Sequence, residues 1–215
     1  MIFSRYSPHL EDGFFGDCEI KITYKLKGNK LYMYQDVATK TRAYISLTNH
    51  VAFNLNEDKD TDILNHQLFI NASKMINLDK EFIPSKIVSV NSVFDFRMKK
   101  EIKRDLFLKD EQLLIGKGYD HPYILDKSID NLACTLEVED LKVNIYTTLP
   151  VLVLYIGNFI EEQNNLISGK SHYRGSVALE PQGIPNNQEF KEYKDNNIIT
   201  KEKPLKEYII WEFIM

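Results

Sequence analysis

The stretch that decides the fold is Cys18-Glu19-Ile20-Lys21-Ile22-Thr23-Tyr24-Lys25-Leu26, in which every even position is apolar or aromatic and every odd position is polar. Side chains alternate between the two faces of a strand, so this pattern predicts a β-strand with one face on a core and one in water. Gly28-Asn29 is a turn signal, and Leu31-Tyr32-Met33-Tyr34 resumes the run. The two runs together predict a β-hairpin.

Short segments of the same kind recur along the rest of the chain. They are rich in Val, Ile, Tyr and Phe and are separated by turn residues, which is typical of an antiparallel sandwich or barrel. The segments are residues 43–47, 68–71, 87–90, 133–138, 142–148, 152–156, 176–179 and 207–214.

Signals for other structure are few. Residues 99–114 predict one or two short helical turns, and the polar stretch 186–203 predicts a long surface loop. The 215 residues show no repeat, low-complexity segment or linker. We therefore expect one all-β domain over residues 1–215.

Composition bounds the class of protein. The sequence is 43% hydrophobic and 27% charged, with a net charge of −4, which gives no electrostatic reason to expect nucleic acid or an acidic membrane surface. No apolar run reaches the length of a membrane-spanning helix, and residues 1–13 hold no apolar segment of signal-peptide length. Cys18 and Cys134 are interpreted as small buried hydrophobes in a reducing compartment, with a single disulfide as the alternative. These features predict a cytoplasmic protein without nucleic-acid or membrane partners.

General acid–base chemistry is the reaction class that the motifs leave open. None of the five histidines has a partner at metal-ligand spacing, and no serine lies in GxSxG. Neither cysteine lies in a nucleophile motif. We therefore expect no metal site and no covalent nucleophile. A proton donor and acceptor with pKa values near neutrality would be enough.

Three stretches offer such groups. His50 lies at an expected strand end, where Thr48 and Asn49 could orient its ring. Gly118-Tyr119-Asp120-His121-Pro122 places a carboxylate and an imidazole in an expected loop. Glu180 closes the apolar run Val177-Ala178-Leu179, and partial desolvation there would raise its pKa and make it a better base. Taken singly, each such residue is more often structural than functional.

Taken in order, these stretches resemble the aldose 1-epimerase (galactose mutarotase) family. Each motif is short, but the ordered set is specific and covers nearly the whole chain. The matching residues are Thr48-Asn49-His50 with Phe53-Asn54-Leu55, Ile83-Pro84, Phe94-Asp95-Phe96-Arg97, Gly118-Tyr119-Asp120-His121, Thr147-Thr148 with Pro150, Tyr155 with Gly157-Asn158, and Ala178-Leu179-Glu180 with Gln182 and Pro185.

The resemblance implies a large antiparallel β-sandwich, galactose mutarotase-like, and interconversion of the α and β anomers of a hexose without a cofactor. It implies that Glu180 is the general base and His50 the general acid. Asp120 and Asn49 would help to bind the sugar, and Tyr155 would pack against an apolar face of the sugar.

The chain also departs from the family pattern. Family members carry a further N-terminal part with strands, an arginine and a second histidine, so we expect an N-terminally truncated sandwich. Pro181 replaces a residue that is usually polar, and Asn186 stands where an aspartate is common. Unpaired strands and bare apolar surface would favour self-association or a complementary chain. A non-catalytic hexose-binding or remnant protein on the same scaffold is the alternative function.

Overall fold

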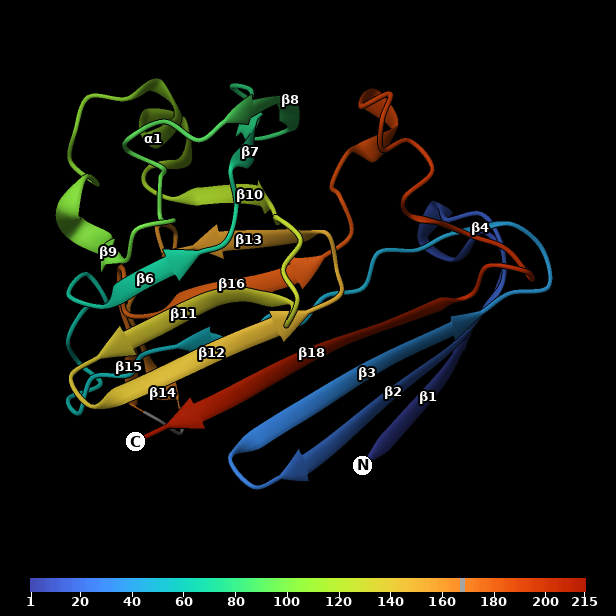
Figure 1. Ribbon diagram of the computed structural model, residues 1–215, viewed down its shortest axis with the longest axis horizontal. Coiled ribbons are helices and arrows are strands. Elements are labelled where there is room, and N and C mark those ends of the chain that lie inside the picture. Colours follow the sequence, from blue (N-terminus) through green and yellow to red (C-terminus); the bar gives the residue numbers. More distant parts are fainter. Residues whose placement is uncertain (167–168) are drawn as a thin grey trace.

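The computed structural model describes the backbone of residues 1–166 and 169–215 and the side chains of residues 1–162 and 171–215. Strands dominate these residues (Figure 1), and each strand pairing among them is antiparallel. The expected all-β antiparallel fold is confirmed.

Two large sheets form the layers of the sandwich. The eight-stranded sheet has the order β1 (Ile2–Ser7), β2 (Cys18–Lys27), β3 (Lys30–Ala38), β18 (Leu205–Ile214), β12 (Leu141–Thr147), β11 (Leu132–Val138), β6 (Gln67–Ile70) and β9 (Lys100–Glu101). The six-stranded sheet has the order β5 (Ala52–Phe53), β16 (Val177–Gln182), β13 (Val151–Tyr155), β10 (Asp120–Ile124), β7 (Lys74–Leu78) and β8 (Pro84–Ser89).

The remaining elements are short. Two small pairs are β14 (Gln163–Leu166) with β15 (Gly169–Ser171) and β17 (Ile198–Ile199) with β4 (Ala43–Tyr44). The helix α1 (Glu111–Gly116) and the 3-10 turns η1 (Glu11–Gly13), η2 (Ile102–Arg104) and η3 (Asn187–Glu189) complete the described chain. No helix in the described part of the chain is long and apolar enough to cross a membrane.

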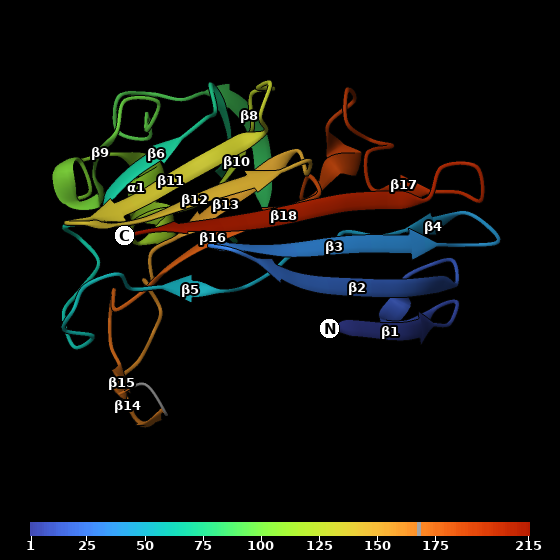
Figure 2. The ribbon, with the colours of Figure 1, turned by 60° about the horizontal axis from the view of Figure 1, so that its bottom comes forward.

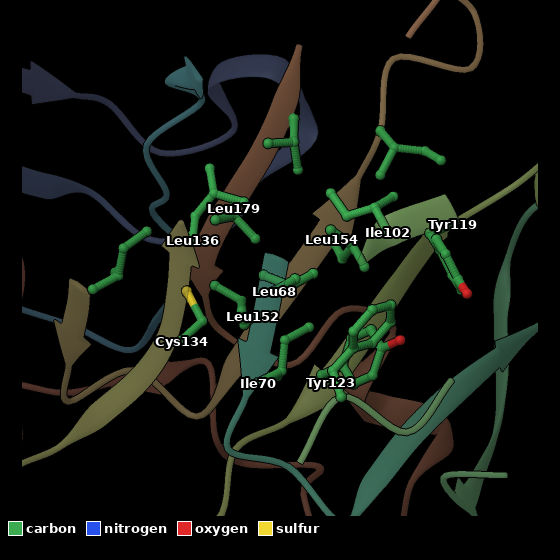
Figure 3. Packing of buried hydrophobic residues seen from close by; sticks show 14 of the residues in the cluster. Leu68, Ile70, Ile102, Tyr119, Tyr123, Cys134, Leu136, Leu152, Leu154 and Leu179 are labelled. Carbon is green, nitrogen blue, oxygen red and sulfur yellow. The ribbon is translucent and has the colours of Figure 1, made fainter. Parts of the chain in front are cut away.

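The main core lies between the two sheets. Leu68, Cys134 and Leu136 of the eight-stranded sheet are fully buried together with Leu152 and Leu154 of the six-stranded sheet (Figure 3). Burial of such side chains is worth about 1.5–3 kcal/mol each. This packing makes the six-stranded sheet a firm base for the side chains on its other face.

The hairpin of β2 and β3 forms as expected, but its inner face is less buried than the alternation predicts. Cys18 is buried, Ile22 and Tyr24 are partly buried, and Leu26 is 73% exposed. Figure 2 shows the reason, since β1, β2 and β3 extend past the six-stranded sheet, so that no second layer covers them fully. Strand alternation identifies a face but not how much of the opposite sheet lies over it.

The expected loop at Gly118–Pro122 is only partly right, because Gly118 and Tyr119 lie in a loop but Asp120–Ile124 forms β10 in the middle of the six-stranded sheet. A proline is usually excluded from a central strand since it lacks the N–H group. Here β7 pairs only with Tyr123 and Ile124, so Pro122 has a strand partner on one side alone, at Val153 of β13.

The expectation of a surface loop at residues 186–203 is only partly right. Asn187 and Asn197 are buried, and the Asn197 side chain donates to the carbonyl of Ile184 at 2.9 Å. In the same stretch Ile198 and Ile199 form β17. Buried amides that satisfy backbone groups allow so polar a segment to pack.

Candidate active site

The order of strands in the six-stranded sheet brings the predicted residues together. His50 lies two residues before β5, Glu180 lies within β16 and Asp120 begins β10. Tyr155, at the end of β13 between them, pairs with Asp120 on one side and Ala178 on the other. Alternation places Asp120, Tyr155 and Glu180 on the sheet face that points away from the main core.

His50 and Glu180 are in direct contact. The Nε2 atom of His50 lies 3.2 Å from Oε1 of Glu180. The two side chains differ in environment, because the imidazole is 70% exposed and the carboxylate only 10% exposed. The pair therefore joins a group that exchanges protons with water to a group that is largely removed from it.

Burial makes both carboxyl groups weaker acids. It raises the pKa of Asp120 to about 6, although the nearby His50 opposes the shift. It also raises the pKa of Glu180, and there His50 lowers the pKa while the charge of Asp120 raises it further. The two carboxyl groups thus have shifted pKa values and respond to neighbouring charges, which is typical of sites that move protons.

Asp120 is fixed by the neighbouring histidine. The Nδ1 atom of His121 accepts from the backbone N–H of Asp120 at 3.1 Å, so its Nε2 is the protonated atom and donates to Oε1 of Gln112 at 3.2 Å. Burial lowers the pKa of His121 to about 4, which keeps the ring neutral. His121 is therefore a structural support of β10 and α1 and not a second acid.

The loop before Asp120 is locked by a close approach. A Cβ atom at Gly118, whose φ is +136°, would overlap the side chain of Asn158. The Asn158 amide donates to the carbonyls of Gly116 at 3.1 Å and Tyr119 at 3.0 Å. Only glycine fits at position 118, so this contact between Gly118 and Asn158 fixes the loop from which β10 begins at Asp120.

A group of aromatic rings adjoins Asp120 and was not fully identified from the sequence. The ring of Tyr155 stacks on Phe159 at a centroid distance of 6.4 Å, and Phe82 contacts Phe159 edge-on at 5.8 Å. Phe159 and Phe82 are 46% and 44% exposed. The Nζ atom of Lys117 lies 5.0 Å from the centre of the Phe159 ring. The motif Gly157-Asn158-Phe159 could have indicated Phe159, whereas nothing local marks Phe82.

Comparisons with known proteins match the sequence to a known family and the arrangement of strands to solved structures. The family model described as aldose 1-epimerase matches residues 1–202. The chain belongs to the aldose 1-epimerase family. The family resemblance expected from the ordered motifs is thus confirmed.

Individual aldose 1-epimerase relatives agree. The aldose 1-epimerase of Haemophilus influenzae is 32% identical over 93% of this chain and 60% of that protein. The galactose mutarotase of Rattus norvegicus is 29% identical over 85% of this chain and 54% of that protein. The chain spans 54% to 60% of the length of these curated relatives.

Solved structures of aldose 1-epimerases have the same fold. A GalM/aldose epimerase homologue from C. elegans superposes with a TM-score of 0.86 at 25% identity, over 99% of this chain and 64% of that one. The galactose 1-epimerase of Lactobacillus acidophilus also gives 0.86, at 24% identity, over 99% of this chain and 61% of that one. The expected galactose mutarotase-like sandwich is confirmed.

The site residues inferred from the aldose 1-epimerase motifs fall into two groups. His50, Glu180 and Asp120 lie together, with Tyr155 beside them. Asn49 is engaged in holding the chain, since its Oδ1 accepts from the Val51 N–H at 3.0 Å and its Nδ2 donates to the Tyr24 hydroxyl at 3.3 Å.

Proposed function

We propose that this chain interconverts the α and β anomers of hexoses such as galactose and glucose by general acid–base catalysis. The observation that carries the proposal is the 3.2 Å contact between His50 and Glu180. The two hexose oxygens that exchange protons in this reaction, O1 and the ring oxygen, are bonded to the same carbon. A donor and an acceptor that serve them must therefore lie close together, as His50 and Glu180 do.

The reaction runs through an open-chain sugar. Glu180 takes the proton from the O1 hydroxyl while His50 protonates the ring oxygen, and the bond between C1 and the ring oxygen breaks to leave an aldehyde. Rotation about C1–C2 presents the other face of the aldehyde. Reclosure returns the proton from Glu180 to O1 and that from the ring hydroxyl to His50. The reaction requires an ionised Glu180 and a protonated His50. The charge of His50 favours the ionised carboxylate by lowering the pKa of Glu180, against the burial that raises it.

Asp120 would hold the hexose by accepting hydrogen bonds from hydroxyls on the side away from C1. Glu180 lies two strands away from Asp120 and two residues farther along, because Ala178 is the residue level with Asp120 on β16. The two Cα atoms are therefore about 12 Å apart at the usual strand spacing and rise, which leaves room for a hexose ring. Tyr155, with Phe159 stacked on it, would pack against an apolar face of the sugar.

The inner face of β1–β3, at one end of the eight-stranded sheet, exposes apolar side chains that a partner could cover. It exposes Phe3 (54%) and Leu26 (73%), and β1 is an edge strand. We propose one domain over residues 1–215 whose β1–β3 face is covered by a second copy or a complementary chain. We also propose a cytoplasmic location, supported by two buried free thiols, Cys18 and Cys134.

The test is polarimetry of freshly dissolved α-D-galactose. The protein is expected to bring the rotation to equilibrium faster than buffer, and no acceleration would reject the enzymatic proposal. Calorimetry with galactose distinguishes an enzyme from the alternative, a non-catalytic hexose-binding protein. Such a protein would bind galactose, and Asp120→Ala would weaken the binding, but the protein would not accelerate mutarotation.

A further inference from the structure

The turn that carries His50 is tied to both sheets of the sandwich. We propose that Tyr24, Thr48 and Asn49 are positioning residues, which hold the His50 imidazole against Glu180 without touching the sugar. This inference rests on the proposed function, because it explains how the acid stays next to the base.

The first reason is that packing does not hold the imidazole. Its ring is 70% exposed, and a side chain so exposed visits several rotamers unless its backbone and contacts restrict it. The position of its Nε2 atom, 3.2 Å from Glu180, therefore depends on where the turn places the Cα atom of His50.

The second reason is a bond to the strand of the base. The Thr48 hydroxyl donates to the carbonyl of Pro181 at 2.9 Å. Pro181 directly follows Glu180 in β16 and pairs with Leu152 of β13. The proline ring restricts the backbone at this point, which helps to fix the carbonyl that Thr48 uses. The acid and the base are thereby linked through a short path of one hydrogen bond and a few covalent bonds.

The third reason is a bond to the opposite sheet. The Asn49 side chain makes two hydrogen bonds. Its Oδ1 accepts from the Val51 N–H at 3.0 Å, and its Nδ2 donates to the Tyr24 hydroxyl at 3.3 Å. Tyr24 lies on β2, and its ring is braced edge-on by Phe3 at a centroid distance of 6.2 Å. The turn is therefore held at Thr48 by the six-stranded sheet and at Asn49 by the eight-stranded sheet.

Asn49 consequently has a different role from the sugar binding that the family resemblance implies. Both of its polar atoms already have protein partners that close the turn, so we assign Asn49 to holding His50 in place. Since a misplacement of about 1 Å can slow catalysis by about 100-fold, loosening either bond should lower the rate.

The experiment uses hydroxyl deletions that keep the shape of each side chain. Thr48→Val and Tyr24→Phe are each expected to lower kcat for galactose about tenfold and leave KM within about twofold, because neither residue touches substrate. Thr48→Ser keeps the hydroxyl and should restore the rate. Tyr32→Phe, on the neighbouring strand and the opposite sheet face, is the matched control and should behave as wild type.

A second readout does not depend on turnover. The titration of the Glu180 carboxyl, followed by carbon-13 NMR, should move to higher pH in Thr48→Val and Tyr24→Phe, since the His50 charge that lowers its pKa has moved away. A wild-type kcat and an unchanged Glu180 titration in both variants would overturn the positioning role. A lower melting temperature with an unchanged titration would also overturn it, because that result describes a purely structural role.

Failure of the proposed function is recognised separately. If the wild-type protein does not accelerate mutarotation, the enzymatic proposal falls. The Glu180 titration in the variants then decides alone whether the turn positions His50.

Discussion

Nε2 of His50 and Oε1 of Glu180 lie 3.2 Å apart, although one side chain is mostly in water and the other mostly out of it. This asymmetry suits a proton donor that is refilled from solvent and a base that is strengthened by desolvation.

Removing the base should nearly abolish the reaction. Glu180→Gln keeps the size of the side chain but cannot accept the O1 proton, so we expect kcat to fall about 10²- to 10⁴-fold in the polarimetric assay. The matched control is Glu207→Gln, because Glu207 also has a pKa raised by burial but lies on β18 in the other sheet. Equal losses in the two variants would contradict the assignment of Glu180.

Replacing Asp120 should weaken hexose binding and stabilise the fold. The pKa of Asp120 is raised to about 6, so the ionised carboxylate is disfavoured in the folded protein and stability is lost as pH rises from about 4 through 6. Asp120→Asn removes that penalty, which we expect to be roughly 2 kcal/mol at pH 8 and close to zero at pH 4. Urea unfolding at both pH values checks it, and an equal effect at both would refute the buried-charge account.

His121 should make the fold sensitive to acid. Its pKa of about 4 in the folded protein is below that of an unfolded histidine, so its contribution is present above pH 6.5 and is lost as pH falls toward 4. His121→Gln should be less stable than wild type at pH 7, and the gap should narrow by roughly 2–3 kcal/mol at pH 4. Comparing the two proteins at each pH cancels the opposing titration of Asp120. A constant gap would show that the ring is not neutral and buried as described.

The contact between Gly118 and Asn158 should be intolerant of a methyl group. Gly118→Ala meets both a φ of +136° and the Asn158 side chain, and we expect a loss of about 3 kcal/mol or more together with lower activity. Gly28→Ala is the control, since Gly28 has a φ of +58° and open space around it, and it should cost only about 1 kcal/mol. Thermal unfolding of both variants tests this, and similar losses would mean that the contact with Asn158 is unimportant.

The sequence predicts the layers of this fold better than their extent. The alternation from Cys18 to Leu26 correctly indicates a strand and its inner face, because alternation is a local property of the backbone. It could not show that Leu26 lies beyond the second sheet, since that depends on strands distant in sequence. Pro122 similarly made a strand at β10 hard to predict. A proline is tolerated there only because β7 does not extend alongside it, and the sequence does not show how far β7 extends.

In the candidate site too, local features could be predicted from the sequence, and contacts between distant strands could not. The raised pKa of Glu180 was expected from its apolar surroundings in sequence, and burial is indeed the main cause. The proximity of His50, Asp120 and Glu180 was implied by the family motifs and by no local pattern. The sequence placed Tyr24 on the inner face of a strand but did not link it to the site, and it did not indicate Phe82, because neither residue belongs to a motif of the site.

The strand order β5-β16-β13-β10 has a consequence for how the site is assembled in time. Its chemical groups come from residues 50, 120 and 180, so they meet only when pairings between distant parts of the chain have closed. Such pairings lose more chain entropy than local ones and form slowly. During synthesis β16 follows β5, β10 and β13, so a nascent chain holds His50, the proposed proton donor, long before Glu180, its proposed acceptor, exists. The burial of the Asp120 and Glu180 carboxyls, which disfavours their charged forms, thus requires β10, β13 and β16 to be paired already.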